Sequence, residues 1–183
     1  MRKLFNLTTV ASGLAIGMII AGVFAVIGGS YAHKVVRDQL VPQKIFFSDD
    51  KAELPANLKQ YAGEQVDTPG EAKVFANDYI GLHLKGTADG KTYSEVSGQF
   101  MQDPTNKELA QQRQTLFMGE TLRGTLLSAW GWGTIGTVAL LAGWVLIALG
   151  AILLAIPLLT LAADRRAATA PTGVRAGEPT PAL

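Results

Sequence analysis

Residues 132–158 read WGTIGTVALLAGWVLIALGAILLAIPL, a run without a charged side chain. The run lies inside a longer stretch, 124–163, that lacks Asp, Glu, Lys and Arg, and a second such stretch covers residues 4–32. About 20 apolar residues in an α-helix cross the roughly 30 Å hydrocarbon core of a bilayer, so each stretch is long enough to span it. Because lipid cannot hydrogen-bond an open backbone and two spans cannot close a barrel, the sequence predicts two transmembrane helices.

The charged residues, 16 Lys and Arg and 15 Asp and Glu, lie outside these stretches. A net charge of +1, with no cluster of Lys and Arg, is not that of a nucleic-acid-binding protein. We therefore predict a mainly α fold in which a two-helix transmembrane anchor carries a small, mostly helical extracytoplasmic domain inserted between the spans. The expected segments are a cytoplasmic N-terminus (1–8), the first span (9–32), the extracytoplasmic domain (33–127), the second span (128–160) and a disordered cytoplasmic tail (161–183).

The first apolar stretch has two interpretations. Arg2 and Lys3 precede it and Ser30-Tyr31-Ala32 follows it, as the charged start and small-residue cleavage site of a secretory signal would. A signal core is typically about 7–15 residues long, and this run is longer, which favours an uncleaved anchor.

The orientation follows from a modest bias of Lys and Arg toward both ends of the chain. Tyr31, Trp130 and Trp132 lie at the span ends that face residues 33–127, and amphipathic rings favour the headgroup level of a bilayer. We expect a two-pass protein of the plasma membrane, surrounded by the lipid bilayer, with both termini in the cytoplasm.

Small residues form a different pattern in each span. In the first span they recur every fourth position, at Gly13, Gly17, Ala21, Ala25 and Gly29. In the second span they recur every seventh position, at Ala129, Gly136, Gly143 and Gly150. Small residues let helices approach closely in lipid, and a seven-residue spacing is typical of a left-handed helix pair. Either the two faces pack on each other, or at least one docks onto another protein.

Residues 33–127 contain one clear helix, which begins at the capping box Thr68-Pro69-Gly70-Glu71. An apolar stripe at helical spacing follows, with Gly86 as the expected left-handed cap; its members are Ala72, Phe75, Ala76, Tyr79, Ile80, His83 and Leu84. A second helix is expected to begin at Asp103-Pro104 and to continue into the second span. Asp89-Gly90 indicates a turn, and residues 91–101 fit either a strand or a short helix. The chain has no Cys, so this domain cannot rely on disulfides.

Residues that carry chemistry are scarce. A metal site normally needs clustered His, Cys or carboxylates, and the chain has two histidines and no cysteine. The acidic residues Asp49, Asp50 and Glu53 lack the alternating pattern of a calcium loop. Nucleophile, phosphate-loop and dinucleotide motifs are missing, and the spans have no ionisable residue for an ion path. We expect no catalytic activity, no metal and no cofactor.

Polar residues at the mouth of the second span form a candidate interface. Glu120 and Arg123 are three residues apart and can pair on one helix face. Arg123 either extends to the lipid headgroups with Glu120 as its counter-ion or, together with Arg37 or His33, contacts another subunit. The other candidate interface residues are Phe75, Tyr79 and His83; His83 is expected to be buried with a backbone partner or to lie at an interface.

Four segments, VRDQLVPQKIFF, GEAKVFANDYIGLHL, DGKTYSEVS and FMGETLRGTLL, resemble a set found in uncharacterised two-span membrane proteins of actinobacteria. The resemblance covers most of residues 35–127 and the two-span plan, and it implies no catalytic role. Small two-span proteins with an outward domain occur as accessory subunits of respiratory supercomplexes in these bacteria, so it implies such an assembly as one possible location.

Two functions remain open from the sequence. The first is a non-catalytic accessory or structural subunit that docks on a larger membrane complex, whose other subunits the sequence does not identify. The second is a module that senses a small molecule or lipid outside the membrane. A sensor normally needs an output domain, and the predicted cytoplasmic segments are short. The absence of ionisable residues in the spans and the close-packing faces favour the first.

Overall fold

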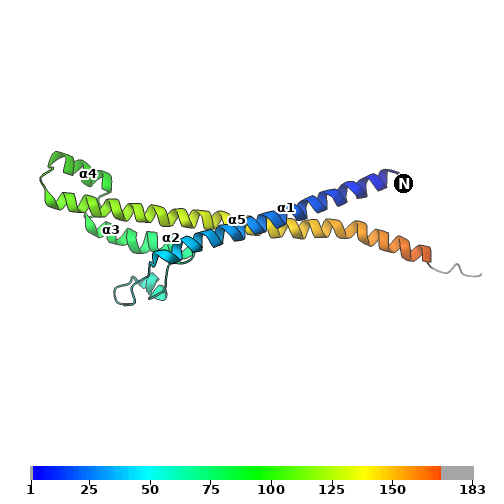
Figure 1. Cartoon of the computed structure of the whole chain (residues 1–183), viewed down its shortest axis with the longest axis horizontal. Coiled ribbons are helices and arrows are strands. Elements are labelled where there is room, and N and C mark those ends of the chain that lie inside the picture. The colour runs from blue at the N-terminus through cyan, green and yellow to red at the C-terminus, as the bar shows by residue number, and fades with distance from the viewer. Residues whose placement is uncertain (1, 170–183) are drawn as a thin grey trace, which may run out of the picture. The chain divides into compact units, whose positions relative to one another are not determined.

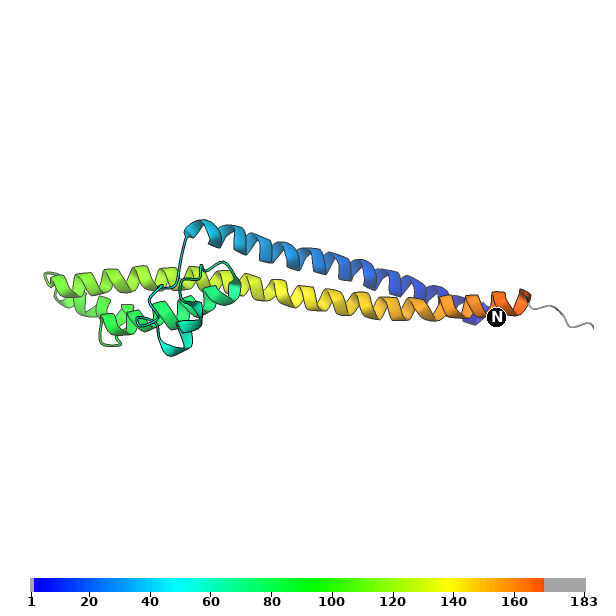
Figure 2. The same ribbon diagram turned by 90° about the horizontal axis from the view of Figure 1, so that it is seen from below.

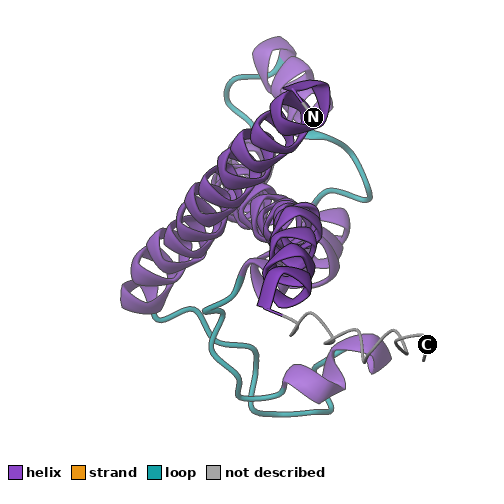
Figure 3. Cartoon of the chain, turned by 90° about the vertical axis from the view of Figure 1, so that its right-hand side faces the viewer, coloured by secondary structure: helices purple, strands orange, loops and turns teal. Residues whose placement is uncertain are grey.

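The computed structural model describes residues 2–169, of which 82% are helical and none forms a strand (Figure 3). The mainly α class is therefore confirmed. Met1 and residues 170–183, most of the predicted disordered tail, lie outside the described residues.

Two long helices, α1 (Arg2–Leu40) and α5 (Lys107–Thr169), are long and apolar enough to cross a membrane. Only 11% of the most apolar window of each helix is buried, whereas the core helix of a soluble protein would be mostly covered. Pro157 lies inside α5 without ending it, and residues 161–169 are helical rather than disordered. Proline is tolerated in apolar membrane helices because neighbouring groups compensate for its missing amide.

The chain divides into two compact units, each made of parts of both long helices. In the unit that contains residues 2–23 and 144–169, Gly150 approaches α1 so closely that a Cβ there would lie 2.8 Å from the carbonyl oxygen of Ala15. Only glycine allows this approach.

In the second unit, residues 24–143, the two long helices run antiparallel (Figure 2). A Cβ at Gly29 would lie 2.5 Å from the carbonyl oxygen of Gly136, so their backbones almost touch. One helical turn further along α1, Nε2 of His33 lies 3.1 Å from Oγ1 of Thr137.

Buried positions recur every seventh residue on both long helices. They are Ala15, Gly22, Gly29 and Val36 on α1, and Gly136, Gly143, Gly150 and Pro157 on α5. Of the small residues expected on α5, Gly136, Gly143 and Gly150 are therefore buried, and Ala129 is half-buried. On α1, Gly13 and Gly17 meet nothing within 4 Å and Ala21 is exposed, so these three residues of the expected face do not pack on α5, and only the alternative of docking onto another protein stays open for them. Residues spaced by four drift around the helix relative to buried positions spaced by seven. The two sets therefore coincide only near Ala25 and Gly29.

The segment between the long helices folds against the first half of α5 (Figure 1). It comprises two 3₁₀ turns, η1 (Val41–Gln43) and η2 (Ala56–Tyr61), then α2 (Pro69–Val74), the π-helical η3 (Phe75–Ile80), α3 (Gly81–Thr87) and α4 (Tyr93–Gln102). Phe47 anchors its core, with its ring 5.0 Å from Phe75 and 5.1 Å from Tyr61. Phe46 and Gln65 form an isolated antiparallel bridge, which joins the non-helical segments on either side of η2.

Capping residues set where these helices begin. The expected box at Thr68 and Glu71 is present, and an equivalent box at Thr92 and Glu95 begins α4, which resolves the ambiguous stretch 91–101 as helix. The helix expected at Asp103-Pro104 begins instead at Lys107. Oδ1 of Asn106 accepts hydrogen bonds from the amides of Glu108 and Leu109, so Asn106 is the capping residue.

The π-helical η3 changes the register of the apolar stripe. A π turn contains more residues than an α turn, so the buried positions continue through Ile80, Gly81, Leu84 and Ala88 instead of reaching His83. Gly86 lies inside α3 and does not cap it. After α3 the left-handed residues are Asp89 and Gly90, with φ of 51° and 79°, at the turn predicted there.

Candidate interaction surfaces

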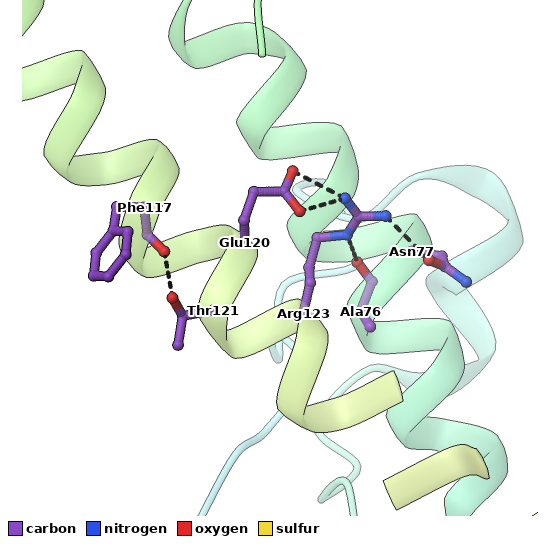
Figure 4. A network of polar contacts seen from close by, with 6 residues as sticks. All are labelled: Ala76, Asn77, Phe117, Glu120, Thr121 and Arg123. Carbon is purple, nitrogen blue, oxygen red and sulfur yellow. Dashed lines mark hydrogen bonds and ion pairs between the residues drawn. The ribbon is translucent and has the colours of Figure 1, made fainter. Parts of the chain in front are cut away.

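Arg123 connects α5 to the π-helical turn (Figure 4). Its Nε donates a 3.0 Å hydrogen bond to the carbonyl oxygen of Ala76, and Nη2 donates to Oδ1 of Asn77 at 3.3 Å. Nη1 donates to both carboxylate oxygens of Glu120, at 2.9 and 3.0 Å. Three directions of one guanidinium are therefore occupied within the chain, as its planar, forked geometry allows.

The Ala76 carbonyl has two donors because of the π turn. It accepts the Gly81 amide across five residues as well as the Arg123 side chain. The side chain of Arg123 is 26% exposed and that of Glu120 47% exposed. The expected i, i+3 pair thus forms, and its arginine is also bound to the chain's own backbone.

The partners suggested for this pair lie elsewhere. Nη2 of Arg37 forms an ion pair with Asp67 at 2.7 Å, and His33 contacts Thr137. The structure therefore does not bring Arg37 or His33 to Glu120 and Arg123.

The three other candidate interface residues differ in exposure. Phe75 is only 6% exposed and belongs to the core, so the expectation of a surface contact is wrong for it. Tyr79 is half-buried, with its ring 4.7 Å from that of Phe75. His83 is exposed rather than buried, because of the π turn, and its Nδ1 lies 2.8 Å from the carbonyl oxygen of Tyr79. The expected backbone partner of His83 is present.

The three aromatic residues expected at a membrane interface also differ. Tyr31 and Trp132 are 67% and 63% exposed, so their rings can contact the lipid or water that surrounds the protein. Trp130 is half-buried, and the ammonium of Lys73 lies 4.5 Å above its ring centroid. Trp130 therefore packs against α2 through a cation–π contact.

Exposed apolar side chains also occur at the end of the second unit where α4 packs on α5. Phe117 and Met118 are each 54% exposed, and the ring of Tyr93 lies 5.8 Å from that of Phe117. We call these three residues the α4–α5 patch. The spacing of apolar residues in the sequence did not indicate this patch.

A cavity of about 970 Å³ lies between the last turns of α1 and the middle of α5. Its surface is mostly apolar, and its length from Gly28 to Leu40 covers about 18 Å at 1.5 Å per residue. We call it the α1–α5 groove. Sequence reasoning missed it because it depends on how far the two helices separate beyond the close contact at Gly29.

Among the residues that the structure describes, no group of three or more His, Asp or Glu side chains could hold a metal ion, and no polar side chain is buried. No protein-family model, curated protein or solved structure matches the chain.

Proposed function

We propose that the chain is a non-catalytic integral membrane protein, an accessory or structural subunit that docks on a larger membrane complex. In this proposal α1 and α5 cross the plasma membrane, both termini are cytoplasmic and the segment between the helices is extracytoplasmic. The outward-facing apolar side chains of both helices support the membrane placement, since Leu14 on α1 and Val138 and Ile152 on α5 are each about 60% exposed.

The α4–α5 patch carries the docking proposal. Phe117, Met118 and Tyr93 are exposed in the part of the chain whose charge density is that of a water-soluble domain. Clustered exposed apolar residues, aromatic ones above all, mark protein interfaces. The sensor hypothesis gains less support, because the predicted cytoplasmic segments are too short to form an output domain.

To test the docking proposal, the tagged full chain is purified from its native membrane in mild detergent. The proteins that co-purify with it are then identified and quantified by mass spectrometry. We expect one large complex at fixed stoichiometry. Phe117→Asp should reduce its recovery at least tenfold. Leu82→Asp is the matched control, because Leu82 is 52% exposed on α3 and lies outside the patch. Equal recovery with both variants would contradict the docking role of the patch.

The topology is tested with single cysteines, since the chain has none of its own. Lys91→Cys should react with a membrane-impermeant maleimide in intact cells, and Ala163→Cys should react only after the membrane is opened. Reaction of both in intact cells, or a mature chain that begins at His33, would overturn the proposed arrangement.

A further inference from the structure

We propose that the α1–α5 groove is the contact surface of a homodimer, in which each copy of the chain places its α5 in the groove of the other. The proposal rests on the membrane placement proposed above, and it concerns a site separate from the α4–α5 patch. Its basis is the level of the groove relative to the bilayer, the residue spacing of its two sides and the absence of charge in its described lining.

The groove begins at the headgroup level and extends into the water-exposed part of the chain. Tyr31 and Trp132, which our proposal places at the headgroups, both line it. Leu122 lines its outer end and is 40% exposed. At 1.5 Å per residue, Leu122 lies about 15 Å further out along α5 than Trp132. An apolar groove exposed to water is unfavourable, so a second protein surface that covers it would stabilise the chain.

The α5 side of the groove has the residue spacing of a coiled coil. Its residues alternate at intervals of three and four positions, which places them on one face of the helix. They are Thr125, Ser128, Trp132, Ile135 and Ala139. The close approach to α1 is made at the edge of this face, at Gly136, so the rest of the face is available to another helix.

The α1 side has the same spacing, at Gly28, Ala32, Val35 and Gln39. Small residues such as Gly28 and Ala32 let another helix approach closely. A second copy has the same orientation in the membrane, so the two-fold axis is parallel to the membrane normal and the two α5 helices run parallel. Each α5 then contacts the other α5 and the α1 of the other copy, and the four helices form a bundle.

The absence of charge suits a contact between identical copies. Residues near a two-fold axis meet their own counterparts, so a charged side chain there would face a like charge. No charged side chain lines the groove among the described residues. The nearby cations of α1 are paired elsewhere, Lys34 with Asp38 and Arg37 with Asp67. The groove can therefore meet its own copy without like-charge repulsion.

The area of the contact favours a second copy over a single partner helix. The lining extends about 26 Å along α5 and about 18 Å along α1. We take each helix–helix contact as a strip about 9 Å wide, a quarter of the circumference of a helix about 10–12 Å across. A lone helix in the groove would bury roughly 800 Å² in total, less than the roughly 1,000 Å² expected of a specific interface. The two-fold arrangement would bury about 1,100 Å², because the contact of α1 with the other α5 is made twice.

The first test is cross-linking of Thr125→Cys in the full chain, which has no cysteine of its own. Thr134→Cys is the matched control, because both threonines are exposed on α5 and donate a hydrogen bond to a carbonyl of their own helix. They are nine positions apart, so at about 100° per residue they lie on opposite faces. After mild oxidation in native membranes, Thr125→Cys should give a disulfide-linked dimer with at least tenfold higher yield than Thr134→Cys.

The second test places a charge at the same two positions. Light scattering in mild detergent should show two copies of the unsubstituted chain and of Thr134→Lys, but one copy of Thr125→Lys, because two ammonium groups would meet across the axis. Co-expression of Thr125→Lys with Thr125→Asp under different tags should restore a mixed dimer. A folding defect would not be rescued in this way.

Equal cross-linking yields at the two positions would overturn the proposal. So would a Thr125→Cys cross-link to a different protein, a single copy of the unsubstituted chain in mild detergent, or no mixed dimer from the Lys and Asp variants.

Failure of this proposal can be distinguished from failure of the proposed function. If alkaline carbonate releases the chain from membranes, the membrane placement is wrong and the dimer proposal falls with it. Phe117→Asp should remove the larger complex and leave the Thr125→Cys cross-link unchanged. Recovery of the larger complex with a chain that does not dimerise would show that the groove alone has been misinterpreted.

Discussion

The side chain of Arg123 and the backbone carbonyl of Ala76 are joined by a 3.0 Å hydrogen bond, although 47 positions separate them in sequence. The bond fastens the π-helical turn to α5 at a carbonyl that also accepts an amide of its own helix. Arg123 therefore stabilises the fold of the second unit. In our proposal the α4–α5 patch, and not Arg123, forms the contact with another subunit.

Arg123→Met should lower the free energy of unfolding by about 2 kcal/mol, because hydrogen bonds to a charged donor at a partly buried site are lost. Glu120→Gln is the control: its partly exposed ion pair should be worth less than about 1 kcal/mol. Thermal unfolding in detergent, followed by circular dichroism, measures both. An equal loss in the two variants would show that the ion pair, and not the bond to Ala76, fixes the turn.

Gly136→Leu should separate α1 from α5, because even a Cβ added at Gly136 would lie only 3.0 Å from the carbonyl oxygen of Gly29. Gly13→Leu should have little effect on the isolated chain, since Gly13 meets nothing within 4 Å. Cross-linking of His33→Cys with Thr137→Cys, whose native side chains lie 3.1 Å apart, reports the helix separation in each background. A similar cross-linking yield in both backgrounds would contradict the packing at Gly136.

Gly119 and Gly124 of α5 should respond oppositely to alanine. A Cβ at Gly119 would lie 2.4 Å from Cδ2 of Leu84, so Gly119→Ala should destabilise the packing of α3 on α5 by roughly 1–3 kcal/mol. Gly124 faces open space, so Gly124→Ala should stabilise the helix by up to about 1 kcal/mol. Thermal midpoints of the two variants should therefore lie on opposite sides of the unsubstituted chain.

Glu95 should make the stability of α4 dependent on acid. The Thr92 amide, which donates to its carboxylate at 2.7 Å, and then the Thr92 hydroxyl lower the pKa of Glu95 from its usual value near 4.5. The unfolded chain therefore takes up the proton first, so the stabilisation present above that value is lost as the pH falls through the lowered pKa. The thermal midpoint of Glu95→Gln should fall less between pH 7 and pH 3.5 than that of the unsubstituted chain.

The features that the sequence predicted well are those determined locally. The two apolar stretches, the capping box at Thr68 and the turn at Asp89-Gly90 each depend on a few neighbouring residues. The seven-residue spacing of small residues on α5 likewise survives in the structure because regular helix geometry fixes which side chains share a face.

The features that it missed depend on tertiary contacts. A stripe at α-helical spacing could not reveal that the backbone widens at Phe75–Ile80, and this widening exposes His83. The bond from Arg123 to Ala76 joins two helices whose relative placement no local pattern encodes. The α1–α5 groove similarly depends on the divergence of two helices, which residue spacing does not specify.

The π-helical turn also makes the length of this helix critical. If residues 75–80 formed regular α-helix without a deletion, everything after them would rotate by about 100° and shift by about 1.5 Å, and the imidazole of His83 would move toward the hydrophobic interior. Deletion of one residue there would instead remove the extra residue of the turn and leave Gly81, Leu84 and Ala88 on the core side. Natural variants that are one residue shorter here should therefore keep position 83 exposed.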